Sequence, residues 1–170
     1  QVVRAEEHLS NTPRQLLVLE ALGRKPPIYA HCSLILGSDR SKLSKRHGAT
    51  SIKQFSEQGF LPEAIMNYLA NLGWNDGTDK EIYTPDELVD AFKMDRITKS
   101  SAIFDIQKLK WVNSQHIRTY SIDALSDLVD ECLRLPPSLF SNDEARNNSV
   151  SKILATLAIK DMETINDARA

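Results

Sequence analysis

The order of strand and helix signals in the first 36 residues restricts the fold more than any other feature of this sequence. The apolar run Val2-Val3-Arg4 is typical of a buried strand end, and Ile28-Tyr29-Ala30-His31 reads as a second strand that continues into Leu34-Ile35-Leu36. A helix is predicted between them. Strand, helix and strand of this length indicate a βαβ crossover in a parallel sheet. It is only part of a sheet, because a doubly wound nucleotide-binding domain needs more strands.

The helix between these strands is predicted from its two ends. Thr12 is expected to cap it, Pro13 suits the first helical position because it has no N–H to satisfy, and Gln15 completes a capping box. Gly23 is a natural stop. The first strand is therefore expected to pass directly into a capped helix.

From Ser51 onward the apolar spacing is helical. Helices are expected to begin at Ile52, at Pro62, after the capping box Thr84–Glu87, at about Ile106 and after the cap Ser121, with a break at Pro136-Pro137 and a last helix from about Asp143 to Lys160. Trp74 and Trp111 are expected to lie in the core of these helices rather than to stack on bases.

Composition excludes several classes of protein. The apolar share of 41% and the charged share of 26% are those of a globular chain, and no run approaches the roughly 18 apolar residues of a membrane helix. Cys32 and Cys132 have no metal-ligand spacing, so both are expected to be reduced thiols in the core and no metal site is predicted. The start at Gln1 reads as the inside of a strand, which indicates an internal piece of a longer protein.

Positive charge is concentrated in one loop. Between Gly37 and Lys53 five basic residues face the single acid Asp39, although the net charge of the chain is −2. The centre of this stretch is Lys42-Leu43-Ser44-Lys45-Arg46, with two ammonium groups, a hydroxyl and a guanidinium. Such a loop can close over a polyphosphate and neutralise the charge that grows as a phosphoryl group is transferred. The alternative is a solvated basic turn without a ligand.

The loop resembles the second signature of class I aminoacyl-tRNA synthetases, in the form typical of bacterial glutamyl-tRNA synthetases. Leu43 and Arg46 are the variants found in glutamyl enzymes, and glutaminyl enzymes usually carry Met at the position of Leu43. The blocks that match the same family are residues 3–13, 58–64, 67–74 and 104–113. The resemblance covers about residues 1 to 118.

The resemblance implies roles for individual residues. Lys42 and Lys45 would be catalytic, with Lys45 stabilising charge on the ATP phosphates and Lys42 helping to close the loop. Arg4 would bind the side-chain carboxylate of glutamate, and its alternative is a buried ion pair with Glu6 or Glu7. The residues that would contact ATP, entering with Mg²⁺, are Glu7, His8, Ile35, Ser44, Lys45 and Arg46.

The resemblance also implies a domain plan and a function. Residues 1–50 would be the C-terminal part of a Rossmann-type catalytic domain, residues 51–118 a helical region contacting the tRNA stem, and residues 119–170 the start of a helical anticodon-binding domain. The implied protein is a monomeric glutamate–tRNA ligase that binds ATP, glutamate and tRNA(Glu), without a membrane, in the bacterial cytoplasm or an organellar matrix or stroma. The first class I signature, His-x-Gly-His, does not occur, so these residues alone are expected to be inactive. The alternative is a non-catalytic module that binds RNA or protein.

Overall fold

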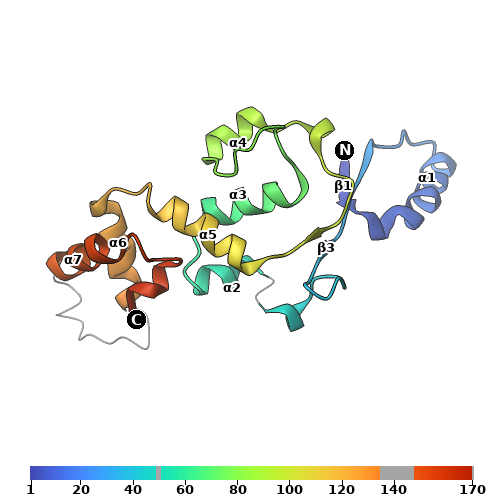
Figure 1. The fold of residues 1–170 in the computed structure, drawn as a ribbon. Coiled ribbons are helices and arrows are strands. Elements are labelled where there is room, and N and C mark those ends of the chain that lie inside the picture. The colour runs from blue at the N-terminus through green and yellow to red at the C-terminus, as the bar shows by residue number, and fades with distance from the viewer. Residues whose placement is uncertain (49–50, 135–147, 170) are drawn as a thin grey trace.

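The computed structural model describes residues 1–48, 51–134 and 148–169. Its first part is a parallel strand–helix–strand unit, drawn in blue in Figure 1. Strand β1 (Val2–Ala5) is followed by a 3-10 helix, η1 (Glu6–Asn11), by helix α1 (Thr12–Ala21) and by strand β2 (Tyr29–Cys32). The two strands pair in parallel from Val2 opposite Tyr29 to Ala5 opposite Cys32. The predicted βαβ crossover is confirmed.

Two details of this unit differ from the prediction. Thr12 does not cap α1, because η1 runs directly into the helix and the hydroxyl of Thr12 instead donates to the carbonyl of His8, at 3.3 Å. The strand end is not buried either, since Val3 is 55% exposed. Among the described residues β1 pairs only with β2, and η1 contacts both strands. The side of this two-stranded sheet on which Val3 lies is left open to solvent.

A second parallel pair connects the lysine loop to the helical part of the chain. Strand β3 (Ile35–Leu36) pairs with β4 (Ala102–Ile103), 67 residues later. Phe104 N–H continues the ladder to the carbonyl of Leu36, at 2.8 Å. The sequence predicts the segment of β3 but not its partner β4, because a two-residue strand is too short to show the apolar–polar alternation of a strand.

The remaining elements are mainly helices, and most begin where the sequence signals placed them. The capping boxes of Ser51 and Thr84 are both closed, the Asp105 carboxylate accepts from Gln107 N–H, and the Ser121 hydroxyl accepts from Ala124 N–H. The elements are α2 (Ile52–Glu57), α3 (Pro62–Gly73), α4 (Pro85–Ala91), η3 (Met94–Arg96), α5 (Ile106–Ile117), α6 (Ile122–Arg134), α7 (Asn148–Ala158) and η4 (Ile165–Arg169). The predicted break at Pro136-Pro137 and the predicted helical residues 143–147 lie outside the described residues.

One apolar core joins the helices on both sides of residue 118. Tyr68 of α3, Leu109 and Val112 of α5, and Val129 of α6 are all buried in it. Asn113, fully buried, accepts from Leu61 N–H at 2.8 Å and donates to the Glu163 carbonyl at 2.7 Å. Figure 1 shows α5 running between α3 and the pair α6 and α7. The division of the chain at 50 and 118 stays a prediction.

The two tryptophans have different environments. Trp74 is buried, with its ring edge-on to Tyr83 at 5.8 Å between ring centroids. The prediction for Trp111 is wrong, since this side chain is 42% exposed. Each residue turns a helix by about 100°, so Trp111 falls outside the face of α5 through which Leu109 and Val112 reach the core.

The predictions about cysteines and membrane helices have simple outcomes. Neither Cys32 nor Cys132 is in a disulfide bond. Cys132 lies in the core, where its thiol donates to Oδ1 of Asn166 at 3.4 Å, whereas Cys32 is only partly buried and the prediction of a core position is wrong for it. Within the described ranges no helix has the length and apolar character needed to span a bilayer.

Candidate functional site

The lysine loop leaves β3 through a tight turn. Gly37 N–H donates to the Ser41 carbonyl at 2.8 Å, and Arg40 adopts a positive φ of 60° to complete the turn. The chain then returns beside β3, where Leu43 N–H donates to the Ile35 carbonyl at 3.0 Å. A short 3-10 helix, η2 (Lys45–His47), follows. The loop therefore has hydrogen-bonded turns, and its role as a ligand site, against the alternative of a solvated basic turn, stays a prediction.

Lys42 is paired with an acid from the end of the first strand. Its ammonium lies 2.6 Å from Oε2 of Glu7, which is in η1, immediately after β1. The hydrogen bond from Lys42 lowers the pKa of Glu7 below its usual value. His8 Nε2 is 3.9 Å from the other oxygen of Glu7. Three residues predicted for one site are thus adjacent in space, although Lys42 is 35 positions from Glu7.

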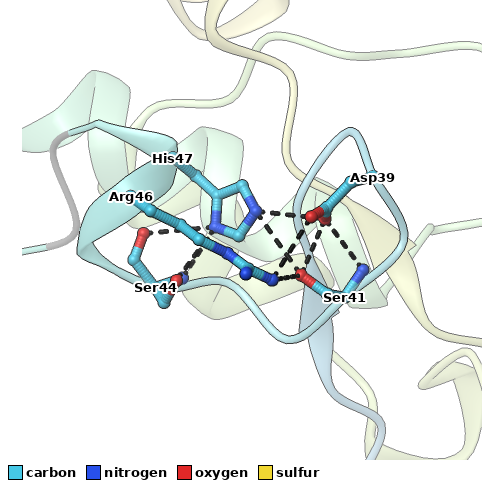
Figure 2. Close-up of polar contacts among 5 residues, drawn as sticks. All are labelled: Asp39, Ser41, Ser44, Arg46 and His47. Carbon is cyan, nitrogen blue, oxygen red and sulfur yellow. Dashed lines mark hydrogen bonds and ion pairs between the residues drawn. The ribbon is translucent and has the colours of Figure 1, made fainter.

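Arg46 is paired within the loop itself, as Figure 2 shows. Its Nη2 donates to the Ser41 hydroxyl at 2.5 Å and lies 3.3 Å from Oδ2 of Asp39. The hydroxyl and the backbone N–H of Ser41 both donate to Asp39, and they lower the pKa of that carboxyl to about 2. Asp39 is therefore ionised at neutral pH, and its charge is directed at the Arg46 and His47 side of the loop.

Lys45 differs from the other two cations. Across the residues that the structure describes, its ammonium has no hydrogen bond and no ion pair, whereas Lys42 and Arg46 are both paired. Ser44, directly before it, donates its backbone N–H to Nδ1 of His47 at 3.0 Å, so its side chain lies against the His47 ring. Among the described residues the side chain of Arg40 is unpaired as well, so Lys45 is one of two uncommitted cations in the loop and the one that lies within the Lys42–Arg46 stretch.

Arg4 lies in a separate polar cluster at the end of β1. Its Nη2 donates to the Thr12 hydroxyl at 2.7 Å, its Nε is 3.4 Å from Nε2 of His31, and its guanidinium lies 5.0 Å from the centre of the Tyr29 ring. The alternative of an ion pair with Glu6 or Glu7 is wrong. Glu6 accepts from the backbone N–H of Leu34 at 3.3 Å, and Glu7 is paired with Lys42.

An open cavity of about 510 Å³ adjoins the Arg4 cluster. Arg4, Arg14, Gln15 and Tyr29 line it together with apolar side chains of β1 and α1. Two guanidinium groups at one cavity suit an anionic ligand of the size of an amino acid. This cavity and the lysine loop both present positive charge beside the parallel strands.

Several residues of this region were not predicted as members of a functional site. They are Thr12 and His31 beside Arg4, and Gly37, Asp39, Ser41 and His47 in the loop. The signal for Asp39 was present, because it is the only acid between Gly37 and Lys53. In the described part of the chain no three His, Cys, Asp or Glu side chains gather as metal ligands would.

The fold and the site together define a class of protein. A βαβ unit whose polar and cationic groups lie past the carboxyl ends of its parallel strands is the arrangement in which α/β proteins bind nucleotides. Residues 1–111 match the family described as tRNA synthetases class I (E and Q), catalytic domain. The chain belongs to this family.

Individual relatives agree with the family. The glutamate–tRNA ligase of Carboxydothermus hydrogenoformans is 55% identical over 127 residues, which are 75% of this chain and 26% of that protein. Glutamate–tRNA ligase 2 of Thermoanaerobacter pseudethanolicus is 43% identical over 169 residues, 99% of this chain and 35% of that protein. This chain thus spans a quarter to about a third of the length of these relatives.

A solved structure gives the same result for the fold. The glutamate tRNA ligase of Elizabethkingia meningosepticum, in complex with its amino acid, matches with a TM-score of 0.80 at 29% identity. The match covers 98% of this chain and 36% of that chain. The predicted class I synthetase fold is confirmed at this level.

Proposed function

We propose that this chain is the lysine-loop part of a glutamate–tRNA ligase, which activates glutamate with ATP to glutamyl-adenylate and transfers the glutamyl group to tRNA(Glu). The observation that carries the proposal is the unpaired ammonium of Lys45 on a braced loop beside parallel strands. A free cation on a fixed backbone stabilises developing phosphate charge without first breaking another contact. Lys45 is therefore assigned to the ATP phosphates.

Lys42 and Glu7 would act in closing the loop. Their ion pair is well exposed on both sides, and exposed pairs contribute only about 0–1 kcal/mol. The cost of exchanging the carboxylate of Glu7 for a phosphate oxygen is accordingly small. Glu7 and His8 would line the nucleotide site, and Ser44 and Arg46 would fix the loop. The backbone of Ile35 would contact the adenine.

Arg4 would bind the side-chain carboxylate of glutamate. Thr12, His31 and Tyr29 hold its guanidinium in place, and it borders the open cavity that Arg14 also lines. A guanidinium held in this way loses little side-chain entropy when it pairs with a carboxylate.

The helical part would bind the tRNA. Residues 51–118 would contact the tRNA stem, and residues 119–170 would begin an anticodon-binding domain. The relatives named above are bacterial, which supports the bacterial cytoplasm as the place of action. The basic residues that would contact RNA phosphates are Lys99, Lys108, Lys110 and Arg118. Lys108 pairs with Glu81 and Lys110 with Glu163, so these two would exchange an exposed carboxylate for a phosphate.

The experiment compares Lys45→Ala with Lys53→Ala in the complete ligase. Glutamate-dependent ATP–pyrophosphate exchange is measured with tRNA(Glu) present, and tRNA affinity is measured separately. Lys45→Ala is expected to slow exchange by about 10²–10³-fold, the usual effect of removing one transition-state donor. Lys53 is the matched control, because it is a nearby lysine with only a 3.8 Å surface pair to Glu57.

The outcome separates the two functions considered for this chain. A large loss of exchange with tRNA affinity within about threefold of the unmodified protein supports the ligase. Equal losses of exchange and tRNA affinity would favour a non-catalytic RNA-binding module. Unchanged exchange in Lys45→Ala would refute the proposed function.

A further inference from the structure

The imidazole of His47 connects the two halves of the lysine loop. Its Nε2 lies 3.0 Å from Oδ1 of Asp39, in the turn that follows β3, and its Nδ1 lies 3.0 Å from the backbone nitrogen of Ser44. A backbone N–H can only donate, so Nδ1 accepts and the ring proton sits on Nε2, where it is donated to Asp39. The ring is nearly buried, with 11% of the side chain exposed. Figure 2 shows it lying between Ser44 and Asp39.

Asp39 is in turn fixed by the turn that carries it. Its Oδ1 accepts from the backbone N–H of Ser41 at 2.9 Å and from the Ser41 hydroxyl at 2.7 Å. These two bonds orient the carboxylate before His47 meets it. The contact between Asp39 and His47 therefore ties the 3-10 turn that contains Lys45 to the rigid turn beside β3.

Gly37 provides the space that the ring occupies. A Cβ atom at this position would lie 2.4 Å from Cδ2 and 2.5 Å from Nε2 of His47, closer than any side chain can approach. Gly37 is not among the residues with positive φ, so glycine is needed here for the close approach and not for the backbone conformation. Any larger residue would displace the ring.

We propose that His47, Asp39 and Gly37 form a brace that positions Lys45 for the phosphates of ATP. None of the three touches a substrate in this scheme, so they are positioning residues. The inference rests on the proposed function of Lys45. Displacing a catalytic group by about 1 Å can cost up to 10²-fold in rate, which sets the scale of the expected effect.

Substitutions that preserve half of the brace give the first test. In His47→Asn the amide oxygen can still accept from Ser44, and in His47→Gln the amide nitrogen can still reach Asp39, but neither side chain spans both. Both variants, like His47→Ala, are expected to lower kcat for adenylate formation about tenfold to a hundredfold, with KM for glutamate within threefold of the unmodified enzyme.

Asp39→Asn is the matched control. The amide oxygen of asparagine can accept all three bonds that Oδ1 of Asp39 accepts. Only the bond from Arg46 to Oδ2 is lost, because an amide NH2 cannot accept, and Arg46 keeps its bond to the Ser41 hydroxyl. This variant is expected to keep kcat within about threefold, whereas Asp39→Ala behaves like His47→Ala. Equal damage in Asp39→Asn and Asp39→Ala would overturn the brace, because the negative charge and not the geometry would then be what matters.

A double-variant cycle tests the role of Gly37. Gly37→Ala alone is expected to reduce kcat as much as His47→Ala, because the added methyl displaces the ring. In the His47→Ala background the same change meets no ring and is expected to cause no further loss. Additive losses would show that Gly37 acts independently of His47, and would overturn the inference.

The 170-residue chain itself offers a readout that does not depend on activity. Long-range ¹H–¹⁵N correlation of the His47 ring is expected to show the proton on Nε2, and Gly37→Ala is expected to abolish that fixed tautomer. If Lys45→Ala slows adenylate formation but the His47 variants leave it within threefold, only the brace fails. If Lys45→Ala itself has no effect, the proposed function fails and the brace fails with it.

Discussion

A buried asparagine in α3 supplies the sharpest stability test of this fold. Asn67 is fully buried, and its Oδ1 accepts from the backbone N–H of Tyr83 and from Nε2 of His116, each at 3.0 Å. Its Nδ2 donates to the Glu81 carbonyl at 2.9 Å. One side chain thus connects α3 to α5 and to the segment before α4.

The cost of Asn67→Ala follows from what it leaves unpaired. The Glu81 carbonyl keeps a second donor, Asn71 Nδ2, at 2.7 Å, so its loss is small. Tyr83 N–H and His116 Nε2 are left buried without an acceptor, and each stranded donor costs about 1–3 kcal/mol. We expect the free energy of unfolding to fall by about 2–5 kcal/mol, a large share of the usual total of roughly 5–15 kcal/mol.

Asn71→Ala is the internal control for this prediction. It removes the same residue type from the same helix and breaks a bond to the same carbonyl, but Asn71 is only partly buried and leaves no second group stranded. Its expected cost is below about 1 kcal/mol. Urea unfolding of the 170-residue chain, followed by circular dichroism, measures both. The reasoning is refuted if the two substitutions cost the same within about 0.5 kcal/mol.

Two further predictions concern pH and activity. Burial lowers the pKa of His116 below its usual 6.5, so as the pH falls from 7 to 5 the unfolded chain binds a proton at this residue more readily than the folded chain, and stability decreases. Thermal melts should show this decrease, and His116→Gln should make it smaller. The 170-residue chain alone is expected not to form glutamyl-tRNA, because the His-x-Gly-His signature of class I synthetases does not occur in it. Charging of tRNA(Glu) with labelled glutamate above background would contradict this.

The sequence predicts those parts of the fold that depend on local signals. The capping box Thr84–Glu87 and the cap Ser121 both form, because the groups they satisfy lie within three residues of the cap. The crossover of residues 2–32 forms because its connection is short and its strands are apolar. Thr12 carries an equally good cap signal and fails, because the 3-10 helix η1 runs directly into α1. Its hydroxyl instead lies against Arg4 and His31, which spacing cannot identify as neighbours.

In the candidate site, too, local spacing does not identify the partners of a side chain. From the sequence Lys42, Lys45 and Arg46 are three similar cations in one loop, and only a resemblance to a family distinguishes their roles. In the structure they differ by partner, since Lys42 meets Glu7 from a distant element, Arg46 meets Asp39, and Lys45 meets neither.

Because their partners differ, the three cations would bind a phosphate at different free-energy costs, and these costs cannot be estimated from composition. A phosphate that approaches the loop gains the full attraction of Lys45, must compete with a carboxylate for Lys42, and must break two contacts to reach Arg46. If the proposed function holds, Lys45 would bind first, Lys42 would follow at small cost, and Arg46 would keep the loop in shape. That expected order depends on the pairing of Lys42 with Glu7, 35 positions away, and of Arg46 with Asp39 inside the loop, and only the folded chain defines both.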